Sequence, residues 1–291
     1  MPKKLRVGPW SKHSLPTLVL LTLVICYYCP TGDQLDTQVS SYPVAFSSYW
    51  WYNVLAFSFM SGMISWTILR SSIGIMVAFT ILSWNMNTVR HGINVLAPFL
   101  YDHHVLLKLN HVLRFPALVS ASLTFVVWNA VLFPYTYFFV LDTKEKKDNF
   151  CAWNFNVRMV QLHCCNIVYS VMNTMVTGTR DGMPPQLFDD EDLWYGLAYS
   201  LVYGLFYTLI LDRVGIHLYP IFSPRSNFVV VTWLLVFSLH YAAYLFWNYI
   251  MRNHWDVIQF NGLIAFNFVV IGTGATIYWA LSKKLPVQKN H

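Results

Sequence analysis

Two apolar stretches of the chain each carry a line of polar side chains that could take part in chemistry. The stretch 73–100 contains, at steps of three, four, three and four residues, Thr80, Ser83, Asn87, Arg90 and Asn94. The stretch 157–177 contains, at the same steps, His163, Asn166, Ser170, Asn173 and Thr177. These steps place side chains on one face of a helix. Because an unpaired polar group in hydrocarbon costs several kcal/mol, we expect both faces to look into a bundle interior or a wet cavity.

Thr80 and His163 begin these two polar lines, and together they could act as nucleophile and base. A Thr hydroxyl attacks poorly until a base removes its proton, and His is the usual base near neutral pH. The group attacked would be one that enters an apolar bundle, such as a lipid ester or thioester. Spacing alone leaves a structural role open, because Ser and Thr in membrane helices often bond to their own backbone or join two helices.

The composition places these residues in a membrane. The 291 residues are 56% hydrophobic and only 11% charged, whereas soluble domains carry roughly 25% charged residues. We therefore predict an all-α, polytopic transmembrane bundle in the endoplasmic reticulum or plasma membrane. The net charge of +6 is concentrated in a leader, 1–14, and a tail, 283–291. Basic ends predict that both termini are cytosolic, so a nucleic-acid partner is not needed to explain the charge.

Apolar runs divide residues 15–282, which we expect to form one membrane domain, into eight crossings. They span 15–29, 43–69, 73–100, 117–141, 157–176, 193–211, 228–250 and 257–281. An even number agrees with two cytosolic ends, and Lys and Arg favour the cytosolic loops. The third and fifth crossings then both begin on the cytosolic side, and Thr80 and His163 lie seven and six residues from their starts. At ~1.5 Å per residue both lie roughly 10 Å deep, so the two side chains could meet.

The remaining titratable groups have simpler interpretations. We assign His103, His104 and His111 to a solvated or interfacial loop, and the acidic run 189–192 to a solvated face. Arg90 and His91 should lie near the outer interface, where Arg90 either snorkels or holds a fatty acid carboxylate. His240, alone on an apolar helix, is typical of a helix–helix hydrogen bond. The five cysteines predict no disulfide framework, and we expect no metal and no cofactor.

Three motifs resemble the androgen-induced protein family, which includes the androgen-dependent TFPI-regulating proteins. The first runs from Phe79-Thr80-Ile-Leu to Gly92-Ile-Asn-Val-Leu96. The second has Asn149-Phe150, Trp153 and Gln161-Leu-His163-Cys-Cys, and the third is Gly215-Ile-His-Leu-Tyr219-Pro220-Ile-Phe222. Their order and spacing are similar to the family's over about residues 73–250. Its members are multipass threonine hydrolases that cleave fatty acid esters of hydroxy fatty acids.

The resemblance implies that Thr80 is the nucleophile and His163 the base, with a membrane lipid or fatty acid ester as substrate. Ser83 and Asn166 would orient His163 or stabilise the oxyanion. Residues on the same faces or in a covering loop would orient or bind substrate, namely Asn87, Arg90, Ser170 and Tyr219. More distant relatives with the same layout are acyltransferases, so acyl transfer stays open. The polar faces alone would also fit a transporter or channel, or a scaffold in which they join helices.

Overall fold

The protein is helical throughout the part of the chain that the computed structural model describes. These residues are 9–30, 42–71, 76, 78–100, 104–177, 185–216, 223–254 and 260–282, and no strand occurs among them. The predicted all-α class is confirmed. The helices enclose a small interior that contains the two polar faces.

Chain order alternates long α-helices with shorter α, π and 3-10 segments. The helices are α1 (Ser14–Tyr28), α2 (Ser48–Ser71), α3 (Phe79–Leu96), η3 (Ala97–Phe99), α4 (His104–Val112), α5 (Arg114–Val126), η4 (Val127–Leu132), α6 (Phe133–Tyr135), η5 (Thr136–Val140), α7 (Lys144–Asn154), α8 (Val157–Val160), η6 (Gln161–Cys165), α9 (Asn166–Val171), η7 (Met172–Thr177), α10 (Asp190–Phe206), η8 (Tyr207–Leu211), α11 (Val229–Asn253) and α12 (Phe260–Ser282). The π segments η4 to η8 continue the α-helices beside them. Residues 157–177 therefore form one continuous helix, as predicted.

Among the described residues, four helical segments are long and apolar enough to cross a membrane. They are Ser48–Arg70, Val105–Val140, Asp190–Leu211 and Val229–Asn253. They coincide with the predicted second, fourth, sixth and seventh crossings, and the protein is compatible with a helical membrane protein. The apolar helix α1 has 15 residues, fewer than the about 20 that a crossing needs. The number of eight crossings and the cytosolic position of both ends stay predictions.

Three predicted boundaries differ from the structure. The third crossing was expected from residue 73, but Ala78 has an extended backbone (φ −70°, ψ 136°) and α3 begins only at Phe79. Residues 72–75 and 77 lie outside the described part. The segments between the predicted crossings 73–100, 117–141 and 157–176 also contain helices, namely α4 in the first and α7 in the second. A side-chain cap starts α7, since the Thr143 hydroxyl accepts from the Lys146 N–H at 3.3 Å.

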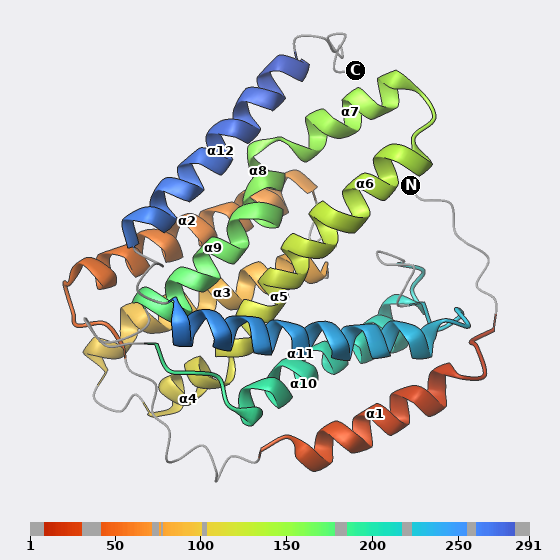
Figure 1. Cartoon of the computed structure of the whole chain (residues 1–291), viewed down its shortest axis with the longest axis horizontal. Helices are drawn as coiled ribbons and strands as arrows, with labels where there is room; N and C mark the ends of the chain where they lie inside the picture. The colour runs from red at the N-terminus through yellow and green to blue at the C-terminus, as the bar shows by residue number, and fades with distance from the viewer. Residues whose placement is uncertain are drawn as a thin grey trace.

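α3 occupies the centre of the molecule, where it packs against α2, α5 and α9 (Figure 1). The Trp84 side chain of α3 is fully buried, and its Nε1–H donates to the Met60 carbonyl of α2 at 3.1 Å. Farther along, Gly92 lets the ring of Phe57 approach, because a Cβ there would lie 3.0 Å from Cε2. α12 lies along α7 and α8 on another side of the molecule.

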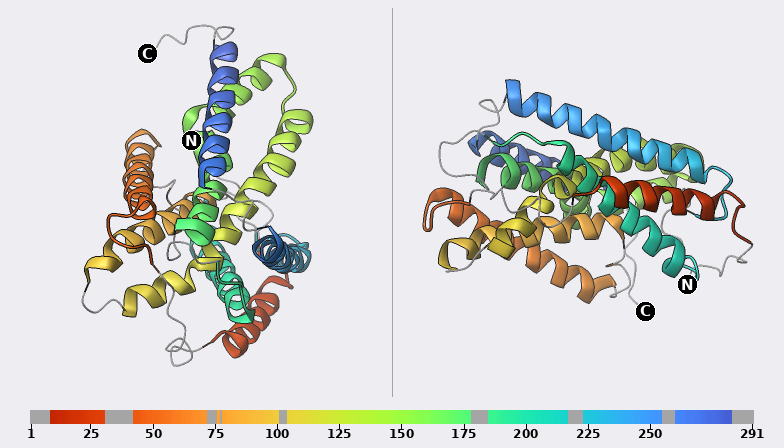
Figure 2. Two further views of the ribbon diagram at one scale, coloured as in Figure 1. Left: turned by 60° about the vertical axis from the view of Figure 1, so that its left-hand side comes forward. Right: turned by 90° about the horizontal axis from the view of Figure 1, so that it is seen from below.

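α1 lies along α10 and α11, away from α3 (Figures 1 and 2). Gly204 of α10 meets the Trp233 indole of α11 so closely that a Cβ would lie 2.3 Å from Cζ2. Farther along the same two helices, His240 Nε2 and Ser200 Oγ form a hydrogen bond of 2.9 Å. The predicted helix–helix role of His240 is confirmed.

The acidic run 189–192 begins α10, and one of its members is not solvated. Asp192 is fully buried and forms an ion pair with Arg114 of α5. The solvated face predicted for this run is therefore wrong at Asp192. The physical reason is local, because Asp189 and Asp192 form a capping box that turns the Asp192 side chain back toward the helix start, where Arg114 lies.

Candidate functional site

The two polar lines face the interior, as their spacing predicts. From the first line, four side chains are buried: Ser83, Asn87, Arg90 and Asn94. From the second line, all five are buried: His163, Asn166, Ser170, Asn173 and Thr177. Of the ten side chains, only Thr80 is partly exposed, because it lies in the first turn of α3, where fewer neighbours cover it.

Hydrogen bonds between the two lines set the helices in register. Asn166 Nδ2 donates to Ser83 Oγ at 2.9 Å, and Asn166 Oδ1 accepts from Asn87 Nδ2 at 2.9 Å. Farther along both helices, Arg90 Nη1 donates to Thr174 Oγ1 at 2.6 Å. Later residues of one helix thus pair with later residues of the other, so α3 and the helix 157–177 run parallel. Ser120 of α5 completes this contact by donating to Ser83 Oγ at 3.0 Å.

This register places Thr80 and His163 at the same level of the two helices. Each lies three residues before the bonded pair Ser83–Asn166, so both lie within about 5 Å of that bond along the helix axes. Among the described residues, His163 contacts Trp128 and the Met159 carbonyl, and no hydrogen bond joins it to Thr80. The meeting of the two side chains in one site stays a prediction.

His163 lies in the π-helical turn η6 and is held by two contacts. Its ring stacks on the Trp128 indole of η4, with ring centroids 4.0 Å apart and planes at 14°. Its Nδ1 lies 3.1 Å from the Met159 carbonyl oxygen. Because a carbonyl only accepts, Nδ1 carries the proton of a neutral ring, and Nε2 is left as a proton acceptor. A π-turn is itself uncommon and occurs often at functional sites.

Trp128 is fixed in turn by α7. Its Nε1–H donates to Asn154 Oδ1 at 2.7 Å. The groups that orient His163 are thus Trp128 and the Met159 carbonyl. Asn166 and Ser83 instead bond to each other and to Asn87 and Ser120. Sequence reasoning missed Trp128, since one indole among twelve carries no distinguishing spacing.

Thr80 lies beside the unpaired donors of a helix N-terminus. The N–H groups of Ile81 and Leu82 both bond to the Ala78 carbonyl, at 3.0 Å. The N–H groups of Phe79 and Thr80 precede these bonds and have no acceptor within α3. Within the described part of the chain, the Thr80 hydroxyl has no hydrogen bond. The nucleophile predicted from sequence therefore has a free hydroxyl next to backbone donors.

A second polar cluster surrounds Arg90 and His91, deeper along the same helices. Arg90 is 2% exposed and His91 is fully buried, so neither snorkels toward an interface, and that prediction is wrong. His91 Nδ1 bonds to Asn53 Oδ1 of α2 at 2.7 Å. Asn94 and Asn173 donate to the same oxygen at 3.3 Å and 3.2 Å. Arg90 and His91 stay inside because three other helices, α2, α4 and 157–177, supply partners there.

Several buried polar atoms on the two lines, and one on the neighbouring His91, have no partner among the described residues. They are Asn87 Oδ1, His91 Nε2, Ser170 Oγ and Asn173 Oδ1. Buried polar groups are normally hydrogen-bonded, to protein or to ordered water. These atoms therefore mark interior positions where water or a bound molecule is expected, and Ser170 lies among them.

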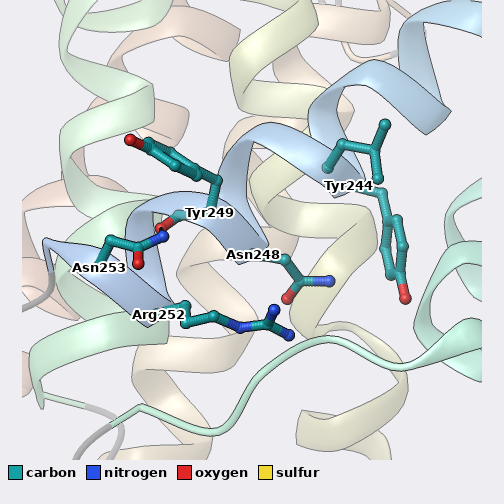
Figure 3. A pocket seen from close by; sticks show the side chains of 6 residues that line it. Tyr244, Asn248, Tyr249, Arg252 and Asn253 are labelled. Atoms are coloured by element: carbon teal, nitrogen blue, oxygen red, sulfur yellow. Dashed lines mark hydrogen bonds between the residues drawn. The ribbon is translucent and has the colours of Figure 1, made fainter.

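The remaining predicted positions fall elsewhere. His217 and Tyr219 lie outside the described residues, as does His103. A shallow open pocket on the α11 surface is lined by Tyr244, Leu245, Asn248, Tyr249, Arg252 and Asn253 (Figure 3). No residue of either polar line contributes to it. Among the described residues, no group of three His, Cys, Asp or Glu side chains could hold a metal ion.

Comparison with known proteins assigns no family. No protein-family model, curated protein or solved structure matches the chain. The resemblance to the androgen-induced proteins rests on its three motifs, and the activity that it implies is argued from the site itself.

Proposed function

We propose that the protein is an integral membrane hydrolase of fatty acid esters, with Thr80 as nucleophile and His163 as base. The observation that carries this proposal is the hydrogen bond from Asn166 Nδ2 to Ser83 Oγ, 2.9 Å long. It joins α3 to the helix 157–177 one turn beyond Thr80 and His163, and it therefore supports their meeting at one level.

The tautomer of His163 suits the first step. Nε2 accepts the Thr80 hydroxyl proton while Oγ1 attacks the ester carbonyl carbon, and the carbonyl π bond becomes an oxyanion. The tetrahedral intermediate collapses by breaking the bond to the alcohol oxygen. The departing alcohol takes the proton from Nε2, and the acyl group stays on Thr80. The bond from Nδ1 to the Met159 carbonyl keeps the imidazole oriented through both transfers.

The second step needs one water molecule, because the acyl group must leave Thr80 as a free fatty acid. Nε2 takes one proton from water, the oxygen attacks the acyl carbon, and Thr80 leaves with that proton as the fatty acid is released. A long-chain alcohol in place of water would give acyl transfer by the same steps. The first-turn N–H groups of Phe79 and Thr80 are the donors best placed for the oxyanion, because backbone donors at a helix N-terminus favour negative charge.

Ester turnover by matched variants tests the proposal. Purified protein in micelles would be given a fatty acid ester of a hydroxy fatty acid, and released acid would be measured. We expect Thr80→Ala and His163→Ala to lose activity by about 100-fold or more, the lower end of what a general base contributes. Thr88 lies on α3 but bonds to its own helix at Trp84, and His254 is exposed, so Thr88→Ala and His254→Ala serve as controls.

Two results would reject the assignment. Full turnover in Thr80→Ala would remove Thr80 as nucleophile, and equal losses in the control variants would indicate general damage to the fold. Adding a long-chain alcohol distinguishes hydrolysis from acyl transfer, since a transferase would form the new ester at the expense of free acid.

A further inference from the structure

The interior of the protein contains a guanidinium whose charge is not balanced by any described residue. Arg90 is 2% exposed. Its Nε donates to Asn110 Oδ1 of α4 at 3.0 Å, and its Nη1 donates to Thr174 Oγ1 at 2.6 Å. Both acceptors are neutral. An Arg side chain has five N–H donors, and among the described residues the other three, both N–H groups of Nη2 included, have no partner.

Asp192, a buried carboxylate, is already engaged. It is bound by Arg114 through Nε and Nη2, and it also accepts from the Asp189 N–H. Because Arg114 already balances this charge, Asp192 offers Arg90 no free carboxylate. Isolated buried charges are costly, and in membrane proteins they mark functional sites.

His111 provides a second, independent indication of a missing acceptor. It follows Asn110 on α4 and is 1% exposed, so the solvated or interfacial loop predicted for it is wrong. Both ring nitrogens are buried without a partner among the described residues. One nitrogen of a neutral imidazole always carries a proton, so at least one donor is unsatisfied. Asn110, the residue before His111, accepts from Arg90 Nε at 3.0 Å, so the two unsatisfied donors lie in one region of the interior.

We propose that Arg90 and His111 bind the carboxylate of a long-chain acyl compound inside the bundle. A carboxylate matches the planar guanidinium, which can offer it two parallel N–H groups, and it also supplies the acceptor that His111 lacks. Water would satisfy single N–H groups but would leave the charge uncompensated. An apolar tail suits the surroundings, since Leu107 and Met172 are fully buried beside Asn110 and Thr174 on α4 and η7.

If the protein has the proposed hydrolase activity, the distance from Arg90 to Thr80 determines how far the ester lies from the carboxylate in the substrate. Arg90 follows Thr80 by ten residues on α3, a separation of about 15 Å at ~1.5 Å per residue. An extended alkyl chain, with C–C bonds of about 1.5 Å, advances by about 1.25 Å per carbon. The ester attacked at Thr80 would then lie roughly ten to twelve carbons from the bound carboxylate.

Direct binding tests the carboxylate site apart from catalysis. Radiolabelled hexadecanoate would be bound to purified protein in micelles, with hexadecanol and hexadecyl phosphate as competitors. We expect Thr80→Ala to bind like wild type, because binding needs no nucleophile. Arg90→Gln and His111→Leu should each weaken binding, the former by roughly ten- to hundred-fold, as expected for a hydrogen-bonded charge. Arg90→Lys, which keeps the charge without the planar fork, should retain part of the affinity.

Arg252→Gln is the matched control. Arg252 is an exposed arginine that lines the α11 pocket, where it could also hold a carboxylate. Unchanged affinity in Arg90→Gln, or loss only in Arg252→Gln, would overturn the proposal. Competition by hexadecanol as strong as that by unlabelled hexadecanoate would also overturn the proposal. Stronger competition by hexadecyl phosphate would show that the site prefers a phosphate to a carboxylate. If Thr80→Ala binds normally while no ester is hydrolysed by wild type, only the hydrolase proposal fails.

Discussion

The contact between Ser83 and Asn166 fixes the site, so its energy is the first quantity to measure. Ser83→Ala leaves Asn166 Nδ2 without its acceptor, while Ser120 Oγ keeps its bond to the Ala117 carbonyl at 3.1 Å. One orphaned buried donor costs about 1–3 kcal/mol. Asn166→Ala also removes the acceptor of Asn87, whose Oδ1 already has no partner. The orphaned Asn87 donor costs about 1–3 kcal/mol and the lost bond to Ser83 about 0.5–1.5 kcal/mol, so we expect a loss of about 1.5–4.5 kcal/mol.

A double-mutant cycle isolates the bond from these losses. The free energy of unfolding would be measured in mixed micelles for wild type, both single variants and the double variant. Because one bond is lost in either single variant, the double variant should be less destabilised than the sum of the two. Interhelical hydrogen bonds in membranes give couplings averaging about 0.6 kcal/mol and reaching about 1.7. We expect a value in the upper half of this range, since both side chains are fully buried.

A control cycle shows whether the coupling is specific. Ser200 bonds to His240 between α10 and α11 and shares no hydrogen-bond partner with Ser83, so Ser83→Ala and Ser200→Ala should be additive within about 0.5 kcal/mol. A coupling between Ser83 and Asn166 no larger than this control would refute the register of α3 and the helix 157–177. The inference that Thr80 and His163 lie at the same level of the two helices would then have no support.

Further predictions follow from packing, charge and topology. Gly204→Ala forces a Cβ into the Trp233 ring and should lower the unfolding free energy by about 1–3 kcal/mol. Gly62→Ala, with no atom within 4 Å of its Cβ, should instead raise the unfolding free energy by up to about 1 kcal/mol. Equal effects of the two variants would contradict the close approach of α10 and α11. Asp192→Asn leaves Arg114 buried without its counter-ion and should cost about 3–5 kcal/mol in the same assay, so a change below about 1 kcal/mol would argue against the pair. Epitope tags on both ends should be accessible from the cytosol in selectively permeabilised cells, and accessibility of only one end would require an odd number of crossings.

The sequence predicted the buried faces because helical periodicity alone determines them. Ser83, Asn87, Asn166 and Asn173 repeat at steps of three and four, and lipid excludes such faces, so their burial needed no knowledge of the fold. Their partners were beyond this reasoning. Any polar residue on a facing helix would have served, and the choice of Ser120 depends on how the helices cross.

The failures share a different cause, which is tertiary packing of short polar segments. His111 and Asp192 lie in runs whose composition is typical of solvated loops. His111 is buried where α4 packs against α3 and α5. The capping box directs the Asp192 side chain toward Arg114 of α5, and local sequence indicates the cap but not this tertiary partner. The start of α3 at Phe79 was missed for a related reason, since the extended backbone of Ala78 interrupts an apolar run that has no proline near that position.

The most direct test of the central proposal is to locate the reactive hydroxyl itself. Membranes containing the protein would be treated with an alkyl fluorophosphonate, which bonds covalently to activated hydroxyl nucleophiles, and the labelled peptide would be sequenced by mass spectrometry. We expect the adduct on Thr80, its loss in His163→Ala at equal expression, and its retention in Thr88→Ala. An adduct on Ser83, Ser170 or another hydroxyl, or undiminished labelling of Thr80→Ala, would contradict the assignment of Thr80 as the nucleophile.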